Sequence, residues 1–185
     1  MPASHLILIS HALTESQRQG RFAVASEPLV QPRPTPPALT WRSGSRLLLA
    51  PEPRARESAA LWPGLLDLPI SVDPELRDLD CGRWQGMELR AVEQAEPQAL
   101  LQWLSDPETA PHGGESFADL RLRMTTWMAA YPAGTSCVAI THPMVVRAVA
   151  GQVLGIPLAQ LSRLDIAPLA RLELSRLDHW RMRLG

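Results

Sequence analysis

Three short apolar runs divide the chain, and each is followed by a polar break and then a stretch with helical spacing. The runs cover residues 5–10 (HLILIS), 46–50 (RLLLA) and 136–141 (SCVAIT). Short, continuously apolar runs are typical of buried parallel strands. The stretches that follow them predict helices over residues 14–20, 53–61 and 143–154.

The middle and the end of the chain predict further elements. Helical patterns cover residues 87–95, 98–104 and 117–131. In the last of these, the apolar positions at helical spacing are Phe117, Leu120, Met124, Trp127, Met128 and Tyr131. Alternation of apolar and polar residues over 170–184 predicts an antiparallel edge hairpin.

Strands that alternate with helices predict an α/β fold: a three-layer α/β/α sandwich with a mostly parallel sheet and an antiparallel edge. The 185 residues are expected to form a single domain. The proline-rich segment 28–37 (PLVQPRPTPP) could be a domain linker, but too little chain precedes it to form a domain. We therefore expect a stiff surface loop there.

Composition limits the possible partners and compartments. Charged residues make up 20% of the chain and the net charge is −1, so no basic field draws the protein onto nucleic acid or anionic lipid. The apolar runs are too short to span a bilayer, and residues 1–5 (MPASH) lack a basic targeting region. Cys81 and Cys137 cannot form a disulfide framework. We expect a cytoplasmic protein with no nucleic-acid or membrane partner.

All 18 basic residues are arginine, and the chain contains no lysine. A genome rich in G and C explains that bias without any function. It nevertheless excludes Schiff-base chemistry, attachment of pyridoxal phosphate and a phosphate-binding loop with lysine. Any bound phosphate must therefore be held by arginine.

Candidate chemistry lies directly after the apolar runs. His11 follows the first run, Arg54 opens the helix after the second, and His142 follows the third. Ligands of open α/β sheets bind outside the carboxyl ends of the strands, so neighbouring strands would bring these side chains into one crevice. Two imidazoles and a guanidinium suit phosphoryl transfer. Taken singly, each also has an ordinary structural interpretation, as a hydrogen-bonded histidine or a solvated arginine.

The order of the motifs resembles the histidine phosphatase (phosphoglycerate mutase-like) superfamily over nearly the whole chain. The family's Arg-His-Gly-x-Thr appears as SHALT, in which His11 and Thr14 match while Ser10 and Ala12 replace Arg and Gly. Its Ser-x-x-x-Arg-Ala-x-Gln-Thr-Ala block resembles APEPRARESA, residues 50–59, and places the phosphate-binding arginine at Arg54.

Further blocks extend the resemblance. LRDLDCGRWQG, residues 76–86, is similar to Leu-x-Glu-x-x-x-Gly-x-Trp-Glu-Gly and places the proton donor at Asp78. The family's Gly-Glu-Ser before a long helix appears here as residues 114–116, which include Glu115. The family's strand that ends in a second histidine appears as VAITH, which ends at His142. The resemblance implies that His11 forms a phosphohistidine and that Asp78 exchanges protons with the leaving oxygen and with water. His142 and Arg54 would hold the phosphoryl oxygens, with no metal or cofactor.

Several roles stay open at this point. Asp78 could be a solvated loop carboxylate, and Asp80 and Glu115 are competing acids. Glu115 also occupies a position that lines the pocket in the family. Gln17 occupies the family's Asn position and is, with Thr14, a candidate phosphate ligand.

Structural interpretations are favoured for other motif residues. Ser116 and Asp119 have the spacing of a capping box. Trp84 is expected in the core. Arg18 and Arg21 are ordinarily solvated helix charges, but either could replace the arginine missing at position 10.

These observations predict a phosphatase that hydrolyses a small phosphomonoester through a phosphohistidine, slowly because Ser10 carries no charge. The alternative is a protein that binds phosphate or a phosphometabolite through a degenerate, catalytically inactive site. In either case the expected partner is a small phosphorylated metabolite.

Overall fold

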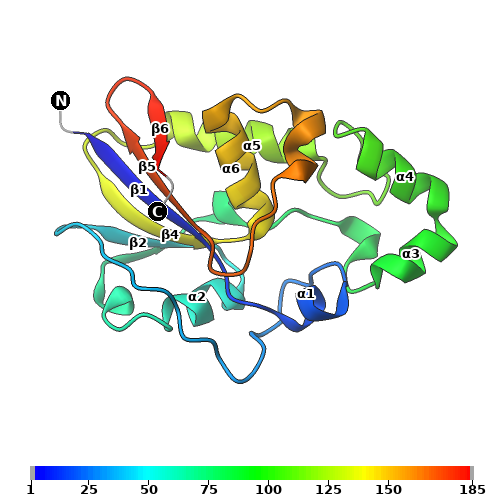
Figure 1. Ribbon diagram of the computed structural model, residues 1–185, viewed down its shortest axis with the longest axis horizontal. Coiled ribbons are helices and arrows are strands. Elements are labelled where there is room, and N and C mark those ends of the chain that lie inside the picture. Colours follow the sequence, from blue (N-terminus) through cyan, green and yellow to red (C-terminus); the bar gives the residue numbers. More distant parts are fainter. Residues whose placement is uncertain (1–2, 184–185) are drawn as a thin grey trace.

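The computed structural model describes residues 3–183, which contain one six-stranded mixed sheet (Figure 1). Across the sheet the strands follow the order β3-β2-β4-β1-β5-β6. Their bounds are β1 Ser4–Ser10, β2 Arg46–Leu49, β3 Ile70–Val72, β4 Ser136–Thr141, β5 Arg171–Arg176 and β6 Trp180–Arg183.

The strand directions confirm the predicted α/β fold. β1 and β2 each pair parallel with β4, and β3 pairs parallel with β2. β5 pairs antiparallel with β1, and β6 pairs antiparallel with β5. The tail therefore forms the expected edge hairpin. Strand β3 was not predicted, because three residues are too short to show a period, and it is defined by its pairing with β2.

Helices cover both faces of the sheet, with α5 and α6 on one side and α2 on the other (Figure 1). The three layers agree with the predicted sandwich. The helices are α1 Glu15–Gln19, α2 Pro53–Ala59, α3 Leu89–Ala95, α4 Pro97–Ser105, α5 Phe117–Ala130 and α6 Pro143–Leu154. Short 3-10 turns cover Leu65–Asp67, Pro74–Leu76, Gly82–Trp84 and Leu158–Arg163.

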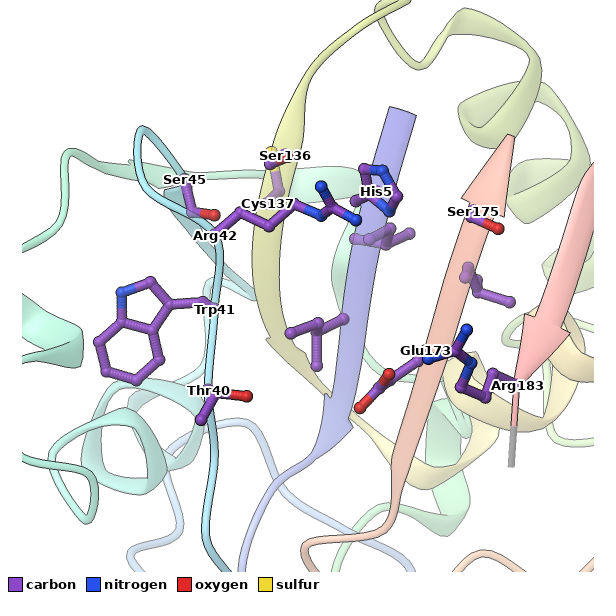
Figure 2. Close-up of a pocket in the computed structure, with 13 residues that line it drawn as sticks. His5, Thr40, Trp41, Arg42, Ser45, Ser136, Cys137, Glu173, Ser175 and Arg183 are labelled. Atoms are coloured by element: carbon purple, nitrogen blue, oxygen red, sulfur yellow. The ribbon is translucent and has the colours of Figure 1, made fainter. Parts of the chain in front are cut away.

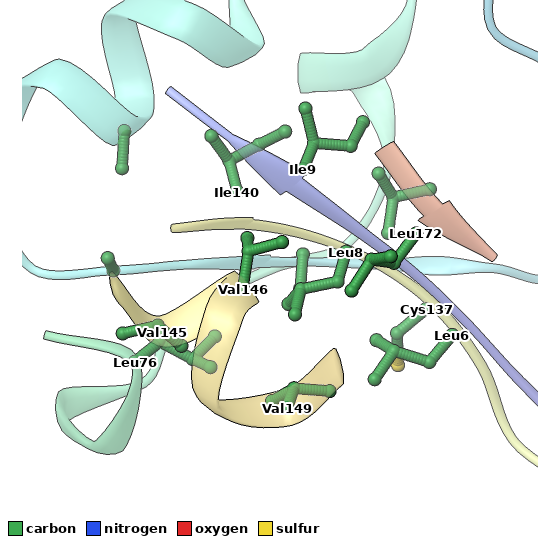
Figure 3. Packing of buried hydrophobic residues seen from close by; sticks show 14 of the residues in the cluster. Leu6, Leu8, Ile9, Leu76, Cys137, Ile140, Val145, Val146, Val149 and Leu172 are labelled. Carbon is green, nitrogen blue, oxygen red and sulfur yellow. The ribbon is translucent and has the colours of Figure 1, made fainter. Parts of the chain in front are cut away.

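The main core covers both faces of the sheet, and Figure 3 shows its part around β1, β4 and α6. Val145, Val146 and Val149 of that helix are fully buried and lie on the side of the sheet that carries Leu6 and Leu8, whereas Ile9 and Ile140 point to the opposite side (Figure 3). Fully burying one such side chain contributes about 1.5–3 kcal/mol. This packing holds β1 and β4 side by side, so that their carboxyl ends are presented together.

The start of α5 confirms the predicted capping box. The Ser116 hydroxyl accepts a hydrogen bond from the Asp119 amide at 3.0 Å, and the Asp119 carboxylate accepts one from the Ser116 amide at 3.2 Å. These bonds satisfy two donors that a helix start would otherwise leave free.

Two expectations about loops and tryptophans are also confirmed. Residues 28–37 form no helix or strand and lie mostly exposed. Trp84 is fully buried and forms, with Val92 and Leu100, a second small apolar cluster against Trp103. None of the helices within residues 3–183 combines the length and apolar character needed to cross a membrane.

Candidate active site

Two histidines meet where β1 and β4 end. Ser10 pairs with Thr141 in the parallel register, so the next residue of each strand, His11 and His142, leaves the sheet at the same level. Their ring centroids lie 5.2 Å apart at an interplanar angle of 69°. Both are buried, and the His11 amide donates to the Thr141 carbonyl at 2.8 Å. The sequence-predicted convergence of the two imidazoles is therefore observed.

Arg54 joins them from the first turn of α2 and is only 1% exposed. Its Nε donates to His142 Nδ1 at 3.3 Å, and its Nη2 donates to Asp78 Oδ2 at 2.8 Å. Its Nη1 donates to the carbonyls of Val24 and Ala25 at 2.8 and 3.3 Å. All three guanidinium nitrogens thus contact acceptors of the protein itself.

The surroundings of His11 determine its tautomer and charge. Its Nδ1 lies 2.7 Å from the Ala12 carbonyl oxygen, which can only accept, so Nδ1 carries the proton. Nε2 therefore keeps its lone pair. Burial, and after it the charge of His142, lowers the pKa of His11 to about 4. The ring is therefore neutral at pH 7.

Asp78 lies between the cationic groups. Its Oδ2 is 2.8 Å from Arg54 and 3.3 Å from His142 Nδ1, while its Oδ1 accepts from the Leu79 amide at 2.9 Å. Burial alone would raise the pKa of Asp78, but its interactions with His142 and Arg54 outweigh burial and hold the pKa below its ordinary value. Asp78 is therefore an ionised, paired carboxylate and not the solvated loop residue of the alternative interpretation.

Glu52 is a residue of the site that the sequence analysis missed. It is the N-cap residue of α2, and its Oε2 lies 2.7 Å from His142 Nε2. Its Oε1 accepts from the Asp78 amide at 3.0 Å. Burial raises the pKa of Glu52, but the hydrogen bond and charge of His142 lower it by more than burial raises it. The pKa of Glu52 therefore lies below its ordinary value. Its position just after β2, where ligand groups gather, is the signal that could have found it.

Ser10 supplies no charge to this cluster. It is fully buried, and its hydroxyl is 3.5 Å from the His11 carbonyl oxygen. Neither arginine considered as a replacement takes its place. Arg18 is exposed and pairs with Glu15, and Arg21 is exposed and pairs with Glu88. Apart from the imidazoles, the site has one cation, Arg54, and two carboxylates.

Comparison with known proteins agrees with this arrangement. Residues 6–184 match the family model of the histidine phosphatase superfamily, branch 1. The chain belongs to the histidine phosphatase superfamily. Glucosyl-3-phosphoglycerate phosphatase of Mycolicibacterium vanbaalenii is 29% identical over 174 residues, which is 85% of this chain and 77% of the relative. Bifunctional protein Rv2228c of Mycobacterium tuberculosis is 29% identical over 128 residues, which is 65% of this chain and 35% of the relative's length.

Solved structures show the same fold. The crystal structure of the alpha-ribazole phosphatase from Shigella flexneri superposes with a TM-score of 0.82 at 19% identity, covering 97% of this chain and 95% of the other. The family and fold expected from the motif order are thus confirmed.

Two candidate ligands of this histidine phosphatase cap a helix instead of contacting the histidines. The Thr14 hydroxyl accepts from the Gln17 amide at 3.4 Å, and Gln17 Oε1 accepts from the Thr14 amide at 3.1 Å. Together they form the capping box of α1. Their side-chain oxygens are therefore engaged in local structure, and their contact with phosphate stays a prediction.

The competing acids are held elsewhere. Glu115 is bound by Arg123 through two contacts of 2.8 and 2.7 Å, with Arg77 3.7 Å away. Asp80 Oδ1 accepts from the Gly82 amide at 2.8 Å. Of the three carboxylates considered as the acid, only Asp78 contacts the histidine cluster.

A hollow of about 220 Å³ opens beside this cluster, and neither His11 nor His142 lines it. It is lined by Glu52, Arg54 and Asp78 of the cluster and by Ala23, Val24, Ala25, Arg77, Leu79, Asp80 and Gln85. Glu115, which the family position predicted to line the pocket, is not among these residues. Arg123 holds its carboxylate, and its contact with a ligand stays a prediction.

A larger hollow of about 340 Å³ lies at the other end of the strands (Figure 2). His5, Ser136 and Ser175 line it from β1, β4 and β5, and Arg42 approaches from the segment before β2. No residue of the histidine cluster contributes to it. The chemistry of the fold lies at the carboxyl ends of the strands, so size does not identify the active site here.

Proposed function

We propose that this histidine phosphatase hydrolyses small phosphomonoesters through a phosphohistidine on His11, and that its turnover is slow. The observation that carries this proposal is the state of His11, which is neutral and hydrogen-bonded through Nδ1 to the Ala12 carbonyl. Its Nε2 lone pair is thereby free beside His142, at the end of the central strand β1. A neutral, oriented imidazole is what in-line attack on phosphorus requires.

The reaction has two displacements. In the first, His11 Nε2 attacks phosphorus, the P–N bond forms, and the ester P–O bond breaks with its electron pair on the leaving oxygen. That oxygen takes the proton that Asp78 binds when the dianionic ester enters beside its carboxylate and raises the pKa of Asp78 above its value in the free protein. In the second, water attacks the phosphohistidine and gives its proton to Asp78, which restores His11 and releases inorganic phosphate.

The slow turnover follows from the charges around the phosphoryl position. Arg54 is the one guanidinium in contact with the described cluster, and its nitrogens already donate to Val24, Ala25, Asp78 and His142. Ser10 supplies neither charge nor a guanidinium fork. Losing one preorganised donor to developing charge typically lowers turnover roughly 10²- to 10³-fold.

The substrate class comes from the relatives and from the size of the hollow. Two relatives are named for different substrates, glucosyl-3-phosphoglycerate and alpha-ribazole phosphate, so we carry over only the shared class, a small phosphorylated metabolite. The neighbouring hollow of about 220 Å³ accommodates a small leaving group. Four of the five Arg54 N–H groups already donate within the protein, which leaves little of this cation for a transition state and favours a second candidate function, binding of phosphate compounds with little turnover.

Phosphohistidine trapping separates the two candidates. The protein is incubated with a ³²P-labelled small phosphomonoester and quenched in alkali, and acid-labile label on the chain is counted. We expect label on the natural protein and none on His11→Asn, because the amide cannot attack phosphorus. Vanadate or phosphate binding without any label or turnover would instead establish the binding function and overturn the phosphatase proposal.

A further inference from the structure

The segment that carries Asp78 has little regular secondary structure of its own. We call residues 75–80 the acid segment; they include the end of a short 3-10 turn and otherwise no helix or strand. Asp78 nevertheless keeps its carboxylate 2.8 Å from Arg54 and 3.3 Å from His142 Nδ1. An aspartate side chain has only two rotatable bonds, so the position of its carboxylate follows that of its backbone closely. Contacts from outside the acid segment must therefore fix that backbone.

Three consecutive carbonyls just before this acid each accept a hydrogen bond from a distant side chain. Arg123 Nη1 donates to the carbonyls of Glu75 and Arg77, the latter at 3.2 Å. Thr141 Oγ1 donates to the carbonyl of Leu76, which lies between them, at 2.6 Å. Because Arg123 belongs to α5 and Thr141 is the last residue of β4, these bonds tie the acid segment both to a helix and to the sheet.

We propose that Arg123 and Thr141 are positioning residues for Asp78. By holding the backbone of residues 75–77, they keep the Asp78 carboxylate beside Arg54 and the histidines. Both act on the reaction through the acid segment. The effect on turnover rests on the proposed phosphatase function, whereas the hold on the acid segment does not and can be measured without substrate.

Arg123 is a fixed donor and not a solvated surface charge. Its side chain is 7% exposed, and its Nε and Nη2 bind the two carboxylate oxygens of Glu115 at 2.8 and 2.7 Å. Such a bidentate pair fixes the plane of the guanidinium, so that Nη1 is directed at the carbonyls of the acid segment. The Glu115 amide in turn donates to the Asp80 carbonyl at 2.7 Å. The pair therefore holds the acid segment on both sides of Asp78.

Thr141 connects the acid segment to the two histidines. It is fully buried, its own carbonyl accepts from the His11 amide at 2.8 Å, and the next residue is His142. Its β-branched side chain is stiff about the first torsion angle, so the hydroxyl has little freedom to leave the Leu76 carbonyl. A single residue thus links the backbone before the acid to the strand ends that carry both imidazoles.

A positioning role and a purely structural role predict different results. If these side chains only stabilise the fold, their loss lowers the melting temperature and leaves the dependence on the leaving group unchanged. If they position Asp78, their loss slows substrates whose leaving oxygen needs a proton and spares those whose leaving oxygen does not. A misplacement of about 1 Å can cost up to about 10²-fold in rate.

The double variant Arg123→Met with Glu115→Gln tests the contact from α5. Glu115→Gln is included because removal of Arg123 alone would leave a carboxylate nearly buried and unpaired. We expect kcat for an alkyl phosphate to fall about tenfold or more, while kcat for an aryl phosphate and KM for both substrates stay within about twofold. Glu115→Gln alone keeps the bonds from Arg123 to the acid segment, so the ratio of alkyl to aryl turnover should not change.

Arg121→Met is the matched control on the same helix. The Arg121 guanidinium also donates to a backbone carbonyl, that of Ile156 at 2.6 Å, but this carbonyl lies outside the acid segment. Its loss should lower the melting temperature and leave the ratio of alkyl to aryl turnover unchanged. A change of this ratio in Arg121→Met as large as that in the double variant would overturn the role of Arg123.

A pair of variants at Thr141 tests the contact from β4. Thr141→Val keeps the shape of the side chain and removes the hydroxyl, so it should show the same selective loss with the alkyl phosphate. Thr141→Ser keeps the hydroxyl and should restore most of that turnover. Equal turnover of the alkyl phosphate in Thr141→Val and Thr141→Ser would overturn the role of the hydroxyl.

Hydrogen exchange distinguishes failure of this proposal from failure of the phosphatase proposal. Exchange of the amides of residues 76–80 is followed by mass spectrometry on the full chain without substrate. We expect it to be at least about tenfold faster in the double variant and in Thr141→Val than in the natural protein and in Arg121→Met. Unchanged exchange, or equal loss of turnover for both substrates, would overturn the positioning role. Faster exchange in a protein that shows no turnover at all would support the hold on the acid segment and overturn the phosphatase function alone.

Discussion

Histidines are buried in two different regions of the molecule, the active site and the aromatic cluster behind it. His112 is 2% exposed, as is His11, and its ring lies 5.0 Å from that of Trp84 and 6.0 Å from that of Trp103. Its Nδ1 accepts from the Gly114 amide at 3.0 Å. Within residues 3–183, neither its Nε2 nor Trp103 Nε1 has a hydrogen-bond partner.

The difference lies in the neighbours and not in burial. Burial is the largest cause lowering the pKa of both His11 and His112, so both rings are neutral near pH 7. His11 faces a second imidazole, the Arg54 guanidinium and Asp78, whereas His112 packs against two tryptophans and feels the charges of Asp80 and Arg83. A buried neutral histidine is therefore no sign of chemistry until charged groups surround it.

The largest expected contrast comes from the same substitution in the two regions. His11→Asn should lower phosphomonoester turnover by roughly 10³-fold or more, because it removes the nucleophile. His112→Asn should leave turnover within a few-fold and lower the melting temperature instead. Steady-state kinetics and thermal melts check both, and equal losses of turnover would remove the distinction between the regions.

The same serine-to-arginine substitution at two positions tests the role of positive charge beside the histidines. Ser10→Arg should raise turnover roughly 10²-fold, because a guanidinium there meets the phosphoryl oxygens as charge develops. Adding Ala12→Gly to it gives the backbone more room near phosphate. Ser105→Arg is the matched control on α4, near the aromatic cluster, where the added charge should change nothing. Fast natural turnover with no gain in either Ser10 variant would show that the pocket is complete without that arginine.

Asp78 should affect leaving groups unequally. Asp78→Ala should slow turnover of an alkyl phosphate roughly 10²-fold and that of an aryl phosphate only a few-fold, because an aryl oxide leaves without a proton. The measurement is kcat for one substrate of each kind. Glu115→Ala is the control at a carboxylate that Arg123 holds, and it should change kcat equally for the alkyl and the aryl phosphate. Equal losses in Asp78→Ala would take the acid role away from Asp78.

The pH dependence of stability gives the smallest effect. The pKa of His11 is about 4 in the folded protein and near 6.5 when unfolded, so the unfolded chain binds the extra proton first as the pH falls. Stability should therefore fall from about pH 6.5 to pH 4, by about 2 kcal/mol at pH 5 for this group. The free energy of unfolding is measured by urea titration at several pH values between 4 and 7. His11→Asn should remove this part of its pH dependence, and His112→Asn should remove a separate part.

Much of the fold and the candidate site follows from the order of residues alone. Short, continuous apolar runs that alternate with helical patterns are typical of buried strands in a covered sheet, so the residues after them are expected at its functional edge. This placed His11, Arg54 and His142 before their contacts were known. Local signals also sufficed where the interaction is local, as in the Ser116 capping box.

Contacts between distant segments were decided only by the tertiary structure. Glu52 is 90 residues from His142 in sequence, and nothing local indicates that their side chains lie 2.7 Å apart. Arg54 was expected to be free for phosphate, but the backbone of Val24 and the carboxylate of Asp78 occupy its donors. Residue types and their order show which groups can reach the sheet edge, whereas charge balance depends on which side chains packing brings together.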